Sequence, residues 1–176
     1  MRLALGLLAF VGLLSASGEL SGRRAPGFSL PDLLGNQHDP QDYAGRIVVL
    51  DIIQTRCPHC AALADVLEKV RSKYGNRVAI MSITIPPDNQ TTVARFATEH
   101  HVTYPLLFDC GQVSASYLKV TPANPTVNVP HLFVIDGKGK IRHDFAYGFD
   151  SKNIFEGDGL STIIDGLLAE TTPAKR

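Results

Sequence analysis

The sequence predicts an α/β fold in which helices cover both faces of a mixed central sheet. Three observations lead to this prediction. Residues 47–53 form an apolar run without alternation, as expected of a strand buried on both faces. Residues 63–74 then change to a helical period, and residues 77–85 return to a strand-like pattern rich in valine and isoleucine.

The remaining elements follow in order along the chain. Residues 25–32 are predicted to be a short extended segment, and the Gly35-Asn36 pair after it is typical of a turn. The helix over 63–74 is expected to end at Gly75. Beyond it, the patterns predict a helix over 91–101, a strand over 104–108, a helix over 111–118, and a hairpin with strands at 131–136 and 140–146.

The C-terminal part is expected to contain a loop, a helix and a tail. Residues 148–157 are predicted to be a loop. The last helix is expected to begin at Asp158 or Ser161 and to carry the apolar residues Leu160, Ile163, Ile164, Leu167 and Leu168. Residues 171–176 are expected to be a flexible tail.

The first residues have the features of a secretory signal peptide, which we expect to span residues 1–17. A positive charge precedes the apolar residues 3–14, and residues 15–17 are small, as before a cleavage site. This apolar run is too short to span a bilayer comfortably, although an uncleaved N-terminal anchor is the alternative. We therefore expect a periplasmic or secreted protein, with a linker at 18–25 and one folded domain at 26–170.

The charge balance and the cysteine content limit the function classes. The 176 residues carry 17 basic and 17 acidic side chains, so nothing in the composition favours nucleic acid as a partner. We expect a monomer without a bound metal or cofactor. The three cysteines are Cys57, Cys60 and Cys110, and an odd number in an exported protein leaves one thiol to be explained.

Cys57-Pro58-His59-Cys60 lies between the apolar strand and the helical pattern. Such a pair can close a disulfide or hold a metal, and its place between a strand and a helix is typical of a redox motif. Cys57 is expected at the helix N-terminus, where unpaired N–H groups favour a thiolate. His59 is expected to stabilise that thiolate further, while Cys60 lies one turn into the helix. We therefore predict Cys57 as the nucleophile and Cys60 as the resolving thiol.

Three stretches together resemble one family. They are Phe28-x-Leu30-x-Asp32-x-x-Gly35 with Tyr43-x-Gly45-Arg46 before the apolar strand, the Cys57–Cys60 motif, and Asn128-Val129-Pro130-His131 leading into the hairpin. In this order they resemble the thioredoxin superfamily, and within it the exported thiol–disulfide proteins of the TlpA/ResA type, which are related to the AhpC/TSA and redoxin proteins. The resemblance covers residues 25–168. It implies a thioredoxin-like fold with an N-terminal hairpin and a helix–strand insertion at residues 91–108.

The resemblance also implies roles for further residues. Pro130 matches the family's cis-proline, which packs against the disulfide, and Val129 offers its backbone to an extended substrate. Asp51 matches a buried acid of thioredoxin that relays a proton to or from Cys60. The redox group is then the Cys57–Cys60 disulfide itself. The implied partners are client proteins with thiols or disulfides, and a membrane or periplasmic electron donor or acceptor.

Two residues depart from the family pattern. Arg56 stands where an aromatic residue usually precedes the first cysteine, and is expected either to stabilise the thiolate and contact substrate or to be a solvated charge at the rim. His131 stands where threonine usually follows the cis-proline, and is expected to face Cys57 and tune it, or else to line the loop. Cys110 is expected to be a buried free thiol, with a second resolving thiol as the alternative.

Other interpretations of the same residues stay open. Cys57 and Cys60 could form a static disulfide, and Asp51 could be a hydrogen-bonded polar residue at a strand edge. A copper chaperone of the Sco type would use Cys57, Cys60 and His131, but that family spaces its cysteines more widely. A peroxiredoxin-like peroxidase needs Pro and Thr ahead of the reactive cysteine, where this chain has Gln54.

The sequence leaves the direction of electron flow open. Thiolate stabilisation by His59, Arg56 and His131 favours an oxidase, and Cys-Pro-His-Cys is also the motif of the periplasmic oxidase DsbA. The TlpA-type scaffold favours a reductant of exported proteins, for example in cytochrome c maturation. A thioredoxin-like reduction potential and a DsbA-like one differ by about 150 mV, or roughly 7 kcal/mol for a two-electron couple. We expect general disulfide reduction or exchange.

Overall fold

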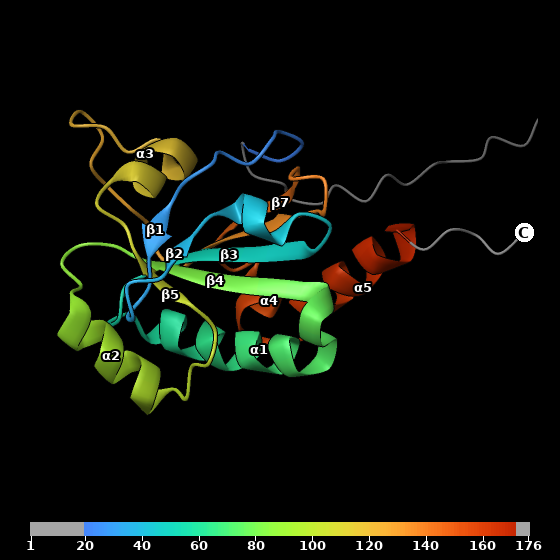
Figure 1. The fold of residues 1–176 in the computed structure, drawn as a ribbon, viewed down its shortest axis with the longest axis horizontal. Helices are drawn as coiled ribbons and strands as arrows, with labels where there is room; N and C mark the ends of the chain where they lie inside the picture. Colours follow the sequence, from blue (N-terminus) through green and yellow to red (C-terminus); the bar gives the residue numbers. More distant parts are fainter. Residues whose placement is uncertain (1–19, 172–176) are drawn as a thin grey trace, which may run out of the picture.

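Five strands form the central sheet of the structure, a computed structural model that describes residues 20–171 (Figure 1). The signal peptide predicted at 1–17 lies outside the described residues, as does the predicted tail beyond Thr171. The order in the sheet is β5 (Leu106–Phe108), β4 (Val78–Thr84), β3 (Ile47–Ile53), β6 (His131–Ile135) and β7 (Ile141–Ala146). β3 pairs in parallel with β4 and antiparallel with β6, so the sheet is mixed, as predicted.

Helices cover both faces of this sheet (Figure 1). One face carries α1 (Pro58–Tyr74), α2 (Gln90–Glu99), α4 (Lys152–Glu156) and α5 (Gly159–Thr171). The other carries α3 (Gln112–Leu118), the start of the described chain and a hairpin of β1 (Leu30–Pro31) and β2 (Gln37–His38). Short 3₁₀ helices lie at Pro40–Tyr43 and Gly75–Arg77. This confirms the predicted α/β architecture.

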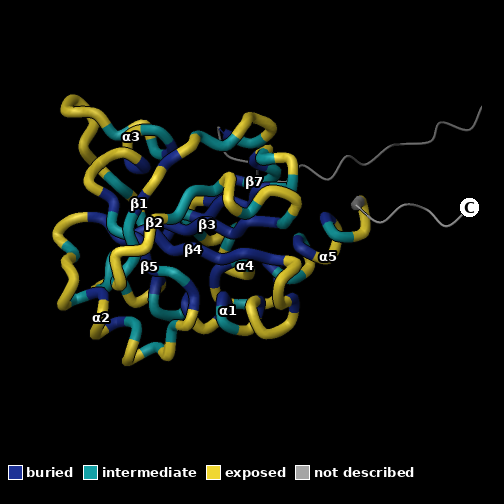
Figure 2. Tube along the Cα trace, in the orientation of Figure 1, coloured by how far each residue is buried: buried dark blue, intermediate teal, exposed yellow. Residues whose placement is uncertain are grey.

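β3 is the core strand because both of its faces are covered. All seven of its residues are buried, and the sheet lies within the dark interior of the trace in Figure 2. Val49 and Ile53 belong to the apolar cluster beneath α1, whereas Leu50 and Ile52 belong to the cluster beneath α3. Since successive side chains of a strand point to opposite faces, Asp51 shares the α1 side with Val49 and Ile53.

The segment at 148–157, predicted to be a loop, contains the helix α4. Its Phe155 side chain is fully buried in the cluster that includes α1 and α5. The Tyr147 ring packs edge-to-face against Phe155, with centroids 5.4 Å apart. The loop prediction was wrong because a helix of five residues with one buried side chain is too short to show a helical period. α5 begins directly after Asp158, one of its two predicted starts.

Residues 20–25, predicted to belong to a linker, pack along the edge strand β7. Leu20 is buried, and its N–H donates a hydrogen bond to the Asp144 carboxylate at 2.9 Å. The backbone just after Leu20 makes two hydrogen bonds with Ile141, of 2.7 and 2.8 Å. An edge strand offers unpaired backbone groups to any nearby segment, and composition alone does not reveal that partner.

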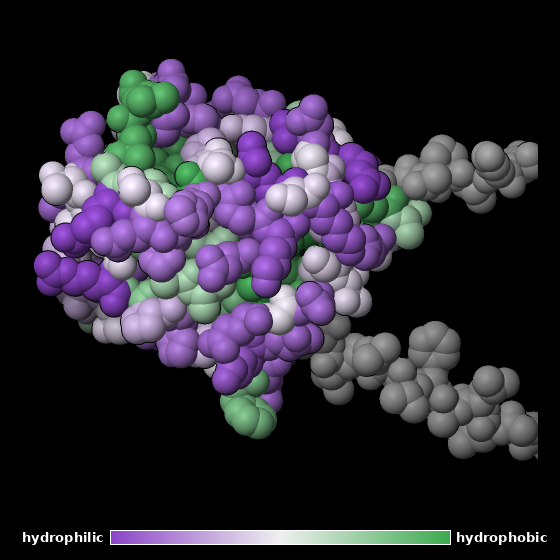
Figure 3. Space-filling view, turned by 90° about the horizontal axis from the view of Figure 1, so that it is seen from below, coloured by the Kyte–Doolittle hydropathy of each residue, from purple (hydrophilic) through white to green (hydrophobic). Residues whose placement is uncertain are grey.

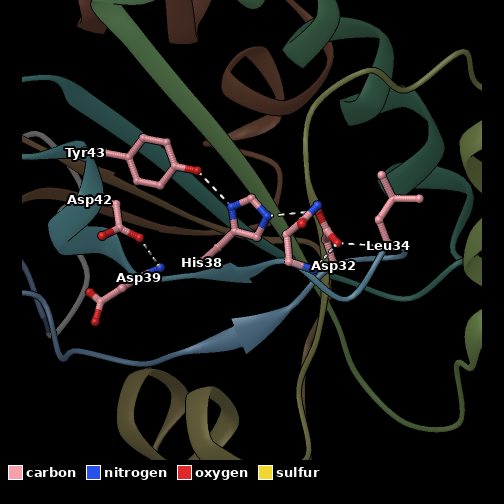
Figure 4. A network of polar contacts seen from close by, with 7 residues as sticks. Asp32, Leu34, His38, Asp39, Asp42 and Tyr43 are labelled. Atoms are coloured by element: carbon pink, nitrogen blue, oxygen red, sulfur yellow. Dashed lines mark hydrogen bonds and ion pairs between the residues drawn. The ribbon is translucent and has the colours of Figure 1, made fainter.

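A chain of polar side chains fastens the β1–β2 hairpin to the 3₁₀ helix that follows it (Figure 4). The Asp32 carboxylate accepts hydrogen bonds from the Leu34 and Asn36 N–H groups, at 2.8 and 2.9 Å. His38 bridges Asp32 and Tyr43, with Nε2 3.0 Å from the carboxylate and Nδ1 2.9 Å from the hydroxyl. Burial by itself raises the pKa of Asp32, but the hydrogen bonds, chiefly those of His38 and Asn36, lower it to about 2.

The surface on the side of α1 and α2 is mostly hydrophilic, as expected for amphipathic helices (Figure 3). Leu34 and Phe149 are the large hydrophobic side chains exposed among the described residues, at 86% and 97%. Across residues 20–171, no helix combines the length and the hydrophobicity needed to cross a bilayer.

Candidate active site

The turn between β3 and α1 places Cys57 at the start of a long helix. Cys57 is the N-cap residue of α1, with an extended backbone at φ −88° and ψ 116°, and Pro58 occupies the first turn. The Cys57 sulfur accepts a hydrogen bond from the Cys60 N–H at 3.2 Å. A helix N-terminus favours negative charge at this position, so the site suits a thiolate.

Cys57 and Cys60 differ in exposure. Cys57 is half-buried, whereas Cys60 is buried in the cluster beneath α1. Neither cysteine is disulfide-bonded in this structure. Burial raises the pKa of the Cys60 thiol, and its contact with Cys57 adds to this effect. One sulfur is thus accessible and the other is shielded and held protonated, which is the asymmetry needed by a nucleophile and a resolving thiol.

The loop before β6 brings Val129 and Pro130 to the reactive sulfur. The Val129–Pro130 peptide bond is cis, and Pro130 is buried. The Val129 carbonyl oxygen lies 3.8 Å from the Cys57 sulfur. The Tyr147 N–H donates to the Pro130 carbonyl at 3.3 Å, which ties the end of β7 to this loop. The structure therefore brings the sequence-predicted docking residues next to Cys57.

Asp51 is a buried carboxyl on the α1 side of the sheet. It pairs in register with Ser82 of β4, whose hydroxyl donates a hydrogen bond to its carboxylate. Burial raises the pKa of Asp51 to about 7, and the hydrogen bond from Ser82 opposes that shift. Its charge is also among the causes that raise the pKa of Cys60, after burial and the contact with Cys57. Asp51 is therefore a core residue on the same side of the sheet as the resolving thiol, and Ser82 is a partner that sequence reasoning missed.

His59, which the sequence predicted to stabilise the thiolate, contacts α4 and the end of β7. Its Nδ1 lies 3.1 Å from a carboxylate oxygen of Glu156, and its ring stacks on Tyr147 with centroids 4.1 Å apart. Its hydrogen-bond partner in the described structure is thus Glu156 and not Cys57. Sequence reasoning missed Glu156 because it assigned this segment to a loop.

His131 points to the opposite face of the sheet, so the prediction that it faces Cys57 is wrong. Its Nε2 lies 2.6 Å from the Asp144 carboxylate, and its ring stacks on Phe133 at a centroid distance of 4.7 Å. The next residue, Leu132, packs in the cluster with Cys60, and strand alternation therefore sends His131 the other way. The copper set of Cys57, Cys60 and His131 is not assembled, and residues 20–171 contain no other group of three potential metal ligands.

Two further predicted residues lie at the surface. Arg56 is exposed in the turn before Cys57, as expected of a rim charge. Cys110 is exposed, so the expectation of a buried thiol was wrong. Asp109 is the buried residue at this strand end, and its carboxylate accepts the N–H groups of Val113 and Ser114 at the start of α3, at 3.0 and 2.9 Å.

Comparisons with known proteins agree with this geometry. The sequence model of the AhpC/TSA family matches residues 21–144. The thioredoxin-like protein YneN of Bacillus subtilis (strain 168) is 28% identical over 127 residues, which are 71% of this chain and 71% of YneN. The thiol-disulfide oxidoreductase ResA of Geobacillus kaustophilus (strain HTA426) is 27% identical over 122 residues, 69% of this chain and 66% of ResA.

Solved structures share the fold at low sequence identity. The thioredoxin domain of a thiol-disulfide oxidoreductase from Bacteroides vulgatus superposes with a TM-score of 0.66 at 20% identity, covering 84% of this chain and 99% of that one. A DsbF homologue from Corynebacterium diphtheriae gives a TM-score of 0.68 at 20% identity, covering 82% and 87%.

Fold and cysteine pair together define the class of this protein as a thioredoxin-like thiol–disulfide oxidoreductase. The chain belongs to the AhpC/TSA family, whose model spans most of its length. The resemblance and the thioredoxin-like fold predicted from the sequence are thereby confirmed.

Proposed function

We propose that this protein exchanges the Cys57–Cys60 disulfide with exported client proteins through a mixed disulfide, chiefly to reduce their disulfides. One observation carries the proposal. The Cys57 sulfur is half-buried at a helix N-terminus, 3.8 Å from the Val129 carbonyl, while Cys60 is buried behind it. This arrangement presents one thiol to a client and reserves the other for the second step.

In the reducing direction, each turnover passes two electrons to the client. The Cys57 thiolate attacks one sulfur of the client disulfide, the client S–S bond breaks, and the second client sulfur leaves as a thiolate that takes up a proton. Cys60 then loses its proton and attacks the Cys57 sulfur. The mixed disulfide breaks, the first client sulfur leaves and is protonated, and the Cys57–Cys60 bond forms. The reverse sequence oxidises a client dithiol.

Asp51 is the proposed proton acceptor for Cys60. Burial raises the pKa of the Cys60 thiol, so its deprotonation needs a base inside the protein. Burial also raises the pKa of Asp51, to about 7. A carboxyl group that titrates near neutral pH can take a proton in one direction and return it in the other.

Val129 and Pro130 form the proposed docking edge. The Val129 carbonyl lies beside the reactive sulfur, so the adjoining backbone can pair with an extended client segment and align its disulfide with Cys57. Arg56, exposed directly before Cys57, is proposed to contact the client at the rim of the site.

We place the reaction in the periplasm or outside the cell. The support is the signal-like sequence at residues 1–17, together with a thiol chemistry that suits an oxidising compartment. A reductant working there must be re-reduced after each turnover. The proposed electron partner is therefore a dithiol protein in the membrane or the periplasm.

The test is the reduction of insulin disulfides in the presence of dithiothreitol. We expect Cys57→Ser and Cys60→Ser to lose activity, and only Cys60→Ser to accumulate a mixed disulfide with a client peptide, detected by mass spectrometry. Cys110→Ser is the matched control and should keep full activity, because this exposed thiol lies outside the motif. Full activity of Cys57→Ser would refute the proposal. Rapid consumption of peroxide that depends on Cys57 would instead favour the peroxidase alternative.

A further inference from the structure

The imidazole of His59 is held on two sides. Its Nδ1 lies 3.1 Å from Oε1 of Glu156, and the Tyr147 hydroxyl donates to that same oxygen at 2.6 Å. The His59 and Tyr147 rings are stacked, with centroids 4.1 Å apart and planes inclined by 24°. A hydrogen bond thus fixes the edge of the imidazole, and an aromatic ring fixes its face.

This cluster of His59, Tyr147 and Glu156 lies beside the reactive sulfur. α4, which carries Glu156, packs against α1, which begins at the cysteine motif (Figure 1). The Tyr147 N–H bonds to the Pro130 carbonyl. The hydrogen bond to Glu156, with a smaller effect of charge on Cys57, raises the pKa of Tyr147 to about 12. Tyr147 therefore links the Pro130 loop beside Cys57 to the His59–Glu156 pair.

We propose that Glu156 and Tyr147 are positioning residues that keep the His59 imidazole bonded to Glu156 rather than to Cys57, and so make the Cys57–Cys60 pair more reducing than its Cys-Pro-His-Cys motif alone implies. This inference rests on the proposed function and deepens it, since it assigns the residues that set the direction of exchange.

The net charge near Cys57 sets the direction of the effect. An unpaired imidazolium next to Cys57 would stabilise the thiolate, and a stabilised thiolate favours the dithiol over the disulfide. The Glu156 carboxylate offsets that positive charge, so the paired side chains present no net charge to Cys57. The ammonium of Lys152, 3.5 Å from the second oxygen of Glu156, offsets part of the carboxylate charge, but its side chain is 62% exposed and solvent screens it.

The test is the thiol–disulfide equilibrium of the full chain with glutathione. Each Cys57–Cys60 disulfide that forms converts one glutathione disulfide into two glutathione thiols, so the measured ratio of reduced to oxidised protein reports the equilibrium constant. We expect Glu156→Gln to shift this constant about tenfold toward the dithiol, which corresponds to a potential about 30 mV higher. Tyr147→Phe keeps the ring stack and loses only the hydroxyl, and should give a smaller shift of the same sign.

Two comparisons separate this role from a merely structural one. Glu170→Gln is the matched control, because Glu170 is a glutamate of α5 paired with Arg142 at 2.8 Å and should leave the equilibrium unchanged. In a His59→Asn background, the effect of Glu156→Gln should fall to less than half, since no imidazole remains to be released. An unchanged equilibrium in Glu156→Gln, or an equal shift with and without His59, would overturn the inference. Failure of the proposed function would look different, because the wild-type pair would then form no disulfide with glutathione, and that result overturns both.

Discussion

Replacing Asp51 by asparagine should stabilise the reduced protein at alkaline pH. Asp51 is buried, and its pKa rises from 3.8 to about 7 because burial disfavours the charged form. A shift of about three pH units at roughly 1.4 kcal/mol per unit corresponds to about 4 kcal/mol. Asparagine has nearly the same shape and still accepts the Ser82 hydrogen bond, but it never carries the charge.

The sign of the pH dependence follows from the direction of this shift. Asp51 binds its proton more tightly in the folded protein than in the unfolded chain, so protonation stabilises the fold. This contribution is fully present below the unfolded pKa of 3.8 and is lost as the pH rises through about 7. The stability of Asp51→Asn relative to wild type should therefore increase by about 4 kcal/mol between about pH 4 and about pH 8.

The measurement is urea unfolding of both proteins at each pH, with dithiothreitol present to keep the cysteines reduced. Circular dichroism is a suitable probe, because the chain has no tryptophan. Asp65→Asn, which changes an exposed carboxylate of α1, is the control and should show no comparable gain. A stability difference between Asp51→Asn and wild type that is equal at both pH values would refute the reasoning. If Asp51 is the proton acceptor, the same variant should also slow the attack of Cys60 on the mixed disulfide.

Three further outcomes are expected. Ser82→Ala removes a hydrogen bond that stabilises the charged Asp51 carboxylate. The pH midpoint for the attack of Cys60 on the mixed disulfide, measured by stopped-flow mixing, should therefore rise by about one unit. A fall in this midpoint would contradict the assigned geometry. His131→Asn should lower the free energy of unfolding by about 2 kcal/mol, because it breaks the largely buried 2.6 Å contact with Asp144. It should leave insulin reduction unchanged. Loss of activity in a folded variant would argue against the placement of His131 away from Cys57. Cys110 should react with iodoacetamide in the native protein while buried Cys60 does not, as peptide mapping can establish.

The parts of the fold that could be predicted are those with a strong local pattern. The apolar run of β3 and the helical period of α1 are long enough to identify a buried strand and the helix after it, and the structure confirms both. The five-residue helix α4 has one buried side chain and no period, and its place in the core depends on its packing against α1. Leu20 looked like part of a polar linker because its partner, Asp144, is 124 positions away.

The candidate site divides in the same way. Cys57, Cys60 and Asp51 lie on one strand and the helix that follows it, so their mutual placement is a local property of the chain. His131 is different, because residues 132–135 are apolar and buried throughout and therefore do not indicate which face of the sheet a neighbour occupies.

By itself, the sequence determined the order of the longer elements and a cysteine pair at a strand-to-helix turn, because backbone periodicity and helix-end chemistry act over a few residues. Only the tertiary structure decided which groups surround that pair. Glu156 reaches His59 across 97 positions, and His131 is turned away from Cys57 toward Asp144. Such contacts depend on how distant segments pack, which is why the neighbours of Cys57 could not be identified from the local sequence pattern.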